Sequence, residues 1–68
     1  MYLGQAINYL NSRTVNKFMI TAKHSLPEID LARGKSKTFG KYDLKGDILS
    51  HEVISIDCVN DIINFEVE

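Results

Sequence analysis

Residues 53 to 67 constrain the fold of this chain more than any other segment, because apolar and polar side chains alternate on both sides of a turn. A turn at Asn60 and Asp61 makes the two halves antiparallel partners and gathers their apolar side chains on one face. Shifting the register by one residue would place Ile56 opposite Asn64 and bury polar groups. The expected pairs are Val59 with Ile62, Cys58 with Ile63, Ile56 with Phe65, and Ile54 with Val67, so that the apolar face holds Ile54, Ile56, Cys58, Ile63, Phe65 and Val67.

An isolated hairpin is only marginally stable in water, so its apolar face needs other elements to cover and extend it. Residues 2 to 11 predict an amphipathic helix, and residues 15 to 23 alternate with the period of a strand whose second face is solvated. We therefore predict an α+β fold, in which an N-terminal amphipathic helix packs on a small antiparallel sheet of about three strands that ends in a C-terminal β-hairpin. The helix stripe consists of Leu3, Ala6, Ile7 and Leu10, and the apolar side of the strand consists of Phe18, Ile20 and Ala22.

The segment after this strand carries the signals of a helix boundary. Ser25 precedes Glu28 by three residues, and Pro27 stands where the first turn would be. This pattern predicts a short helix that ends before Gly34. Apolar and polar residues also alternate within residues 28 to 32, so an extended segment is the alternative there.

Residues 33 to 46 contain three glycines and few large apolar side chains. This composition predicts a mobile basic loop, and residues 43 to 50 have room for a single helical turn. Long loops inside small domains are usually functional, so this segment is a candidate binding surface.

Length and composition restrict the class of protein. A chain of 68 residues suffices for one domain, residues 1 to 68, with a thin core and no deep catalytic cleft.

Cys58, the single cysteine, cannot close an internal disulfide and lies on the apolar hairpin face, so we expect a buried thiol in a reducing compartment. No apolar run approaches the roughly 18 residues of a membrane helix, and the N-terminus lacks a signal-peptide pattern. We therefore expect a cytoplasmic protein that does not bind membranes.

The sequence contains no motif that predicts catalysis or a bound metal. His24 and His51 are far apart and lack a second cysteine at zinc-ligand spacing. Residues 34 to 36 (GKS) resemble the end of a P-loop, but Ile29 occupies the position of the required first glycine. Ser25 stands next to His24 without a third orienting group. We predict a protein that is not an enzyme and that holds no cofactor or metal.

The charge is divided along the chain. Residues 1 to 41 hold seven Lys and Arg against two acids, whereas residues 42 to 68 hold one Lys against seven acids. In a small domain the two halves either neutralise each other on packing or present opposite charges to a partner. Two candidate surfaces follow, one basic and one acidic. The basic candidate consists of Arg33, Lys35, Lys37, Phe39 and Lys41, and the acidic candidate consists of Asp57, Asp61, Glu66 and Glu68.

The basic candidate combines cations with aromatic rings, which is the mixture that binds single-stranded nucleic acid through phosphate contacts and stacking. The isoelectric point of the whole chain is near 6.1, however, and dedicated nucleic-acid-binding domains are strongly basic. Nucleic acid is therefore the less favoured partner.

Residues 52 to 57 (EVISID) and 59 to 63 (VNDII) follow a leucine-containing N-terminal helix. In this arrangement the chain resembles the short uncharacterised proteins of phages and prophages in low-GC Gram-positive bacteria, over about half of its length. The resemblance implies one short helix with a small sheet. It also implies binding rather than catalysis, because many short accessory phage proteins occupy a site on a host protein, including nucleases of CRISPR defence systems.

The function expected from this resemblance is a non-enzymatic protein-binding module of phage or mobile-element origin that inhibits or adapts a host protein. Such a host protein would be a defence protein, which the module inhibits in the manner of an anti-CRISPR or another anti-defence protein. The acidic face of the module would imitate nucleic acid to a basic host protein. The alternative is a small nucleic-acid-binding accessory or regulatory protein that uses residues 33 to 41. The unpaired edges of so thin a sheet also predict self-association into a homodimer.

Overall fold

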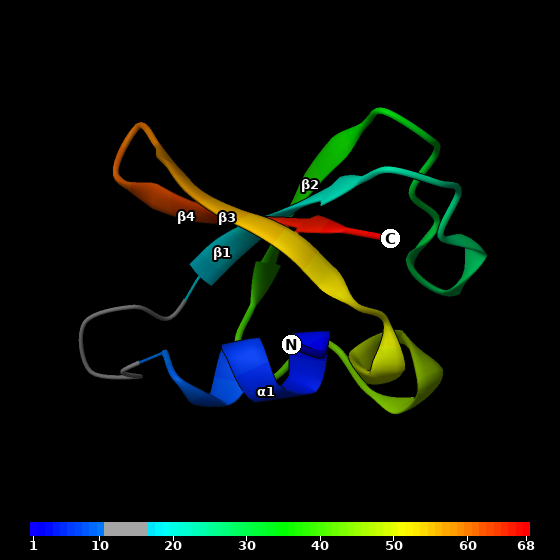
Figure 1. Ribbon diagram of the computed structural model, residues 1–68, viewed down its shortest axis with the longest axis horizontal. Coiled ribbons are helices and arrows are strands. Elements are labelled where there is room, and N and C mark those ends of the chain that lie inside the picture. The colour runs from blue at the N-terminus through cyan, green and yellow to red at the C-terminus, as the bar shows by residue number, and fades with distance from the viewer. Residues whose placement is uncertain (11–16) are drawn as a thin grey trace.

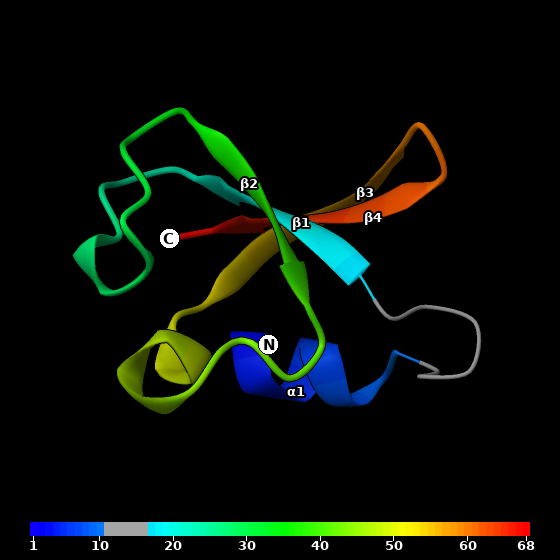
Figure 2. The ribbon, with the colours of Figure 1, turned by 180° about the vertical axis from the view of Figure 1, so that it is seen from behind.

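The computed structural model describes residues 1 to 10 and 17 to 68. Within these residues the strands form one sheet in the order β2-β1-β4-β3, and α1 lies against one of its faces (Figures 1 and 2). None of the helices described is long and apolar enough to cross a membrane. The elements are α1 (Leu3–Asn8), β1 (Lys17–Ala22), the 3-10 turn η1 (Pro27–Ile29), β2 (Ser36–Gly40), the 3-10 turn η2 (Gly46–Ser50), β3 (Val53–Val59) and β4 (Ile62–Val67).

The α+β class is confirmed, but the prediction of about three antiparallel strands is wrong in two respects. The sheet has a fourth strand, β2, within the segment 33 to 46 that we expected to be a mobile loop. In addition, β1 runs parallel to β4, so the sheet is mixed. Parallel strands are joined by a long connection, whereas antiparallel strands can be joined by a short turn that the sequence reveals. A parallel pair therefore has no local sequence signal.

The core lies between α1 and the sheet, and its composition confirms the predicted apolar stripes of the helix and of the first strand. The Phe18 and Phe65 rings meet edge to face at 5.6 Å at its centre. Gly4 allows α1 to approach η2, because a Cβ at this position would lie 3.3 Å from Leu49. The buried residues are Leu3, Ala6, Ile7, Leu10, Phe18, Ile20, Ala22, Leu26, Leu31, Leu44, Ile48, Phe65 and Val67.

The segment expected to form a short helix contains only the 3-10 turn η1. Asp30 ends this turn in the left-handed region at φ 53°, and a bridge between Leu26 and Leu31 closes the loop around it. Neither a regular helix nor the extended alternative over residues 28 to 32 forms.

The single turn expected within residues 43 to 50 is confirmed as η2. The predicted strand from residue 15 is confirmed as β1 from Lys17, and residues 15 and 16 lie outside the described residues.

The register of the C-terminal hairpin is confirmed from the turn as far as Ile56 opposite Phe65. The predicted pair of Ile54 with Val67 is wrong, because Val53 takes the place opposite Val67. A register shift lies between Val53 and Ser55, so the chain fits one extra residue into β3 at this point. Alternation alone cannot reveal such a bulge.

The outer half of the hairpin is more exposed than the sequence predicts. Ile54 and Ile56 are 37% and 56% exposed, and the prediction of a buried Cys58 is wrong, because this thiol is exposed. The physical reason is the length of α1, whose six residues span about 9 Å at 1.5 Å per residue. The helix covers the central strands, while β3 lies at the edge of the sheet.

The hairpin turn yields a first prediction. Asn60 and Asp61 both have positive φ, 51° and 64°, as a two-residue primed turn requires. We expect Asp61→Gly to raise the free energy of unfolding by about 0.5 kcal/mol, because glycine adopts this conformation without a steric cost. Asp61→Ala removes the same charge and should destabilise the protein. Urea titration of both variants is the measurement, and equal shifts in the two would show that charge, not backbone conformation, decides the effect.

Candidate functional site

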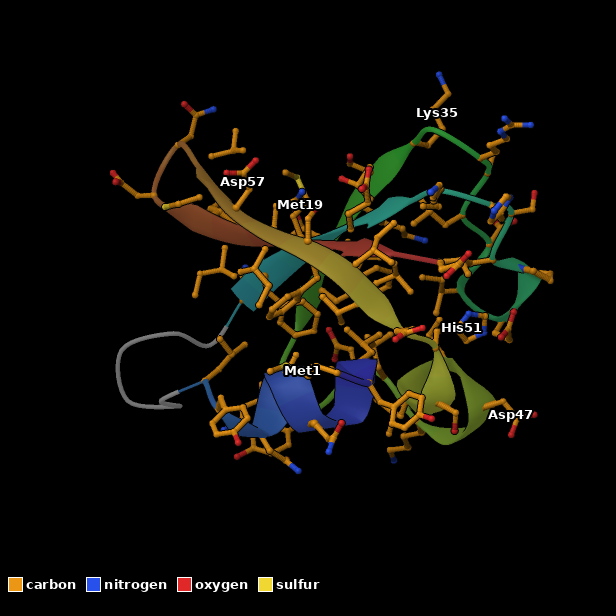
Figure 3. All side chains as sticks on the ribbon, in the orientation of Figure 1. Met1, Met19, Lys35, Asp47, His51 and Asp57 are labelled. Atoms are coloured by element: carbon orange, nitrogen blue, oxygen red, sulfur yellow. The ribbon has the colours of Figure 1, made fainter. Side chains whose placement is uncertain are left out.

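The sheet has one face that α1 does not cover, and we call it the open face. Met19 and Asp57 point from it to the side opposite α1 (Figure 3). The strand registers place polar residues around them in two rows across the sheet. One row holds Thr38, Met19, Asn64 and Asp57, and the next holds Ser36, Thr21, Glu66 and Ser55.

Hydrogen bonds between neighbouring strands hold several of these side chains in place. The Thr21 hydroxyl donates to Asn64 Oδ1 at 2.8 Å, which leaves the Ser36 hydroxyl to donate to Thr21 Oγ1 at 2.7 Å. Ser55 Oγ donates to Glu66 Oε1 at 3.4 Å. The open face is therefore a polar surface whose side chains are partly fixed by hydrogen bonds.

The acidic candidates do not form a single cluster. Asp57 pairs with Asn64, two residues from Glu66 along β4, so these two carboxylates occupy diagonal positions on the open face. Asp61 lies in the hairpin turn, and Glu68 follows β4 at the other end of the hairpin. Within the described residues, the only ion pair involves neither Asp57 nor Glu66. Asp57 is exposed, and Glu66 is half-buried and accepts only the hydrogen bond from Ser55 among the described residues.

The strand order keeps the two charge signs apart. The lysine-bearing strands β2 and β1 form one side of the sheet, and β4 and β3 form the other. Residues 52 to 68, which include β3 and β4, contain five acids and neither Lys nor Arg. The sequence left open whether the positive and negative halves of the chain neutralise each other or stay apart. The strand order favours the second outcome, so the basic side of the sheet lies opposite its acidic side.

The basic candidates do not combine into a stacking surface. Phe39 is half-buried, with its ring 6.5 Å from that of Phe18, and Lys37 Nζ lies over it at 5.7 Å from the ring centroid. Lys41 Nζ donates to the Leu10 carbonyl at 2.8 Å. The remaining two, Arg33 and Lys35, lie in the connection before β2 and are exposed. A nucleic-acid base would thus find no free aromatic ring among these five residues.

An apolar groove lies on the helix side of the sheet, between α1 and the hairpin, and has a volume of about 230 Å³. Two of its residues, Met1 and Tyr9, are 52% and 79% exposed, and Ile56 forms its outer wall. Sequence reasoning missed this groove, because it assigned every apolar residue of the hairpin face to the core. The lining residues are Met1, Ala6, Tyr9, Leu10, Ile56, Ile63 and Phe65.

A wider hollow of about 1000 Å³ lies between α1 and the segment 41 to 50. Tyr2 and Tyr42 are exposed beside it, and Lys41 and Lys45 contribute to its lining. The Lys41 ammonium is already engaged by the Leu10 carbonyl. The other polar side chains of the lining belong to Tyr2, Gln5, Asn8, Tyr42, Lys45 and Ser50.

His51 connects three segments that are distant in sequence. Its Nδ1 lies 2.7 Å from the main-chain oxygen of Glu68, and its Nε2 lies 2.6 Å from Glu28 Oε2. Both ring nitrogens face acceptors, so the geometry fits the imidazolium, which donates from both. The pKa of His51 is raised, first by the Glu68 carbonyl and then by Glu28, while partial burial opposes the shift. The pKa of Glu28 is lowered by its own main-chain amide and then by His51.

These opposite shifts predict how stability depends on pH. The raised pKa of His51 contributes stability below its ordinary value of 6.5, and this stability disappears as pH rises through the folded-state pKa. The lowered pKa of Glu28 contributes stability above 4.5, which disappears as pH falls through its folded-state pKa. We therefore expect the melting temperature to be highest between about pH 4.5 and 6.5. In His51→Gln the decline above pH 6.5 should vanish, and an unchanged profile would contradict the assignment.

Within residues 1 to 10 and 17 to 68, no three His, Cys, Asp or Glu residues come close enough to bind a metal ion. Comparisons with family models, characterised proteins and solved structures found no match for this chain. The open face and the β3 edge are the surfaces of this chain that could bind a partner.

Proposed function

We propose that this protein is a non-enzymatic protein-binding module, and that its open face binds a basic surface of a partner protein. The separation of charge across the sheet carries this proposal. Within the described residues, Asp57 and Glu66 make no ion pair, and they lie on the open face at the acidic side of the sheet. A basic partner would be steered to this side and would form ion pairs with these two carboxylates.

The resemblance to short phage proteins suggests the kind of partner. We propose that the protein originates from a phage or another mobile element, acts in the host cytoplasm, and inhibits a host defence protein that binds nucleic acid. Such a partner has a basic surface for phosphate groups, which are about 1.7 Å apart along the axis of a duplex. Carboxylates on the open face would compete with these phosphates for the same Lys and Arg side chains.

Affinity capture tests this proposal. The tagged full chain is immobilised, exposed to a lysate of a Gram-positive host with and without nuclease, and the retained material is analysed by mass spectrometry and a nucleic-acid stain. We expect a basic protein that is retained after nuclease treatment and released by salt. Nucleic acid bound directly, or a protein lost on nuclease treatment, would instead support the alternative of a nucleic-acid-binding protein.

A further inference from the structure

Beyond the bulge between Val53 and Ser55, the β3 edge of the sheet carries neither a lysine nor a proline, and no described segment covers it. Strands at sheet edges are commonly protected by lysine, proline or a covering segment. On the opposite edge, β2 carries Lys37 and is preceded by Lys35. The sequence of β3, VISIDCV, contains neither a cation nor a proline, and its Ile54, Ile56 and Val59 are among the most exposed apolar residues of the described chain.

The free part of this edge can be located from its hydrogen bonds. At the start of β3, the Val53 amide donates to the Met1 carbonyl at 2.7 Å, so the N-terminal segment occupies the edge there. In the described chain, residues 54 to 59 make no main-chain hydrogen bond beyond those of the sheet itself. Val59 and Ile62 close the two-residue turn and therefore bond to each other. Strand alternation then directs the amides and carbonyls of Ile56 and Cys58 outward.

We propose that a second copy of this chain pairs with the β3 edge, antiparallel and with a two-fold axis at Ile56. This register places the outward amide and carbonyl of Ile56 against those of Ile56 in the second copy. It also places Asp57 opposite Ser55 of the second copy. An axis at Asp57 would oppose two aspartates directly, and an axis at Cys58 would bring the turn residue Asn60 into the pairing.

The apolar groove gives this pairing a side-chain contribution. Ile56 forms the outer wall of the groove and is 56% exposed. Across the two-fold axis, the two Ile56 side chains meet on the helix side of the joined sheet, next to the exposed Tyr9 rings of both copies. The pairing covers apolar surface that α1 is too short to cover. An interface made by one short strand buries less than the usual area of about 1,600 Å². The dimer should therefore be weak, and its population should depend on protein concentration.

The dimer leaves the open face accessible, because the strands join edge to edge. Two four-stranded sheets then become one continuous sheet, whose two acidic sides meet at its centre. The inference therefore goes beyond the proposed function and does not depend on it. Because both hairpins are acidic, salt should strengthen the dimer by screening their repulsion, whereas salt should weaken binding to a basic partner.

Sedimentation of the full chain over about 1 µM to 1 mM tests the dimer. The mass of the wild type should rise from 7.7 kDa toward twice that value, about 15 kDa, with increasing concentration. Ile56→Lys should remain at 7.7 kDa throughout, because it places a charge at the axis. Thr38→Lys, which adds the same charge to the β2 edge, should behave as wild type. A wild type that stays monomeric overturns the proposal and leaves the edge to a strand of another protein.

Thiol crosslinking tests the register. In a Cys58→Ser background, Ile56→Cys places one thiol at the axis, where paired Cα atoms are about 5.5 Å apart, and mild oxidation should give a covalent dimer. The parent chain has one thiol at Cys58, which the Ile56-centred register keeps well apart from its copy. It should crosslink at least tenfold more slowly. Faster crosslinking of the parent would overturn this register. Circular dichroism confirms that each variant is folded.

Discussion

Phe65→Ala is expected to remove about 3–5 kcal/mol from the free energy of unfolding, a large part of the stability that a chain of this length can have. Phe65 is 2% exposed and contacts the Phe18 ring edge to face at 5.6 Å, so truncation would leave a cavity at the centre of the core. A chain of this length has a total stability of only about 3–10 kcal/mol. Urea titration followed by circular dichroism measures the loss.

Ile56→Ala is the matched control for this prediction. Ile56 lies directly opposite Phe65 in the hairpin and belongs to the same alternating apolar set of the sequence, yet it is 56% exposed. We expect this variant to lose about 1 kcal/mol or less, measured at a concentration where the chain is monomeric. Equal losses in the two variants would contradict the exposed position of Ile56 on the outer hairpin.

This contrast marks how far the sequence predicts the fold. Period and turn signals are local, and they correctly predict the buried sides of α1 and β1, the turn at Asn60 and Asp61, and the hairpin register near it. They identify which side chains could be buried. How many of those side chains become buried depends on the area of the sheet that the short helix covers. The periodicity of the sequence gives no information about that area.

The features that escaped prediction depend on contacts between distant segments. The parallel pairing of β1 with β4 joins residues 17 to 22 to residues 62 to 67, and β2 contains too few apolar residues to be recognised as a strand. The bulge in β3 has no compositional signal of its own. Parallel pairing also explains the polarised sheet, because it places an acidic hairpin beside a basic one.

The candidate site was predicted in part. The division of charge along the chain indicated an acidic surface and selected Asp57 and Glu66, which share the open face. It also selected Asp61 and Glu68, which lie at opposite ends of the hairpin. Strand alternation predicts which face of the sheet a side chain occupies only within a regular strand. It does not predict this across a bulge or a turn. The groove and the free edge appear only when the limited coverage by α1 is known.

The proposed function makes its sharpest prediction for the two acids on the open face. We expect the double variant Asp57→Lys, Glu66→Lys to bind the partner recovered by affinity capture on the order of 100-fold more weakly, because two attractions to a basic surface become repulsions. Asp61 is left unchanged, since its φ of 64° would strain a lysine and confuse binding with stability. The measurement is the dissociation constant at two salt concentrations, and the variant should also lose the salt dependence of the wild type.

A charge-matched control separates the position of the charges from their number. Asp47→Lys, Glu52→Lys changes the net charge by the same amount at exposed sites in η2 and just before β3, outside the two rows of the open face and without a positive φ at either position. We expect it to lose no more than about threefold, the part of the effect that long-range steering alone supplies. If both double variants lose affinity equally, the partner responds to net charge and the open face is not its binding site. If Asp57→Lys, Glu66→Lys binds as wild type while it remains folded, the proposed function is wrong, whereas the dimer through β3 stands or falls with Ile56→Lys.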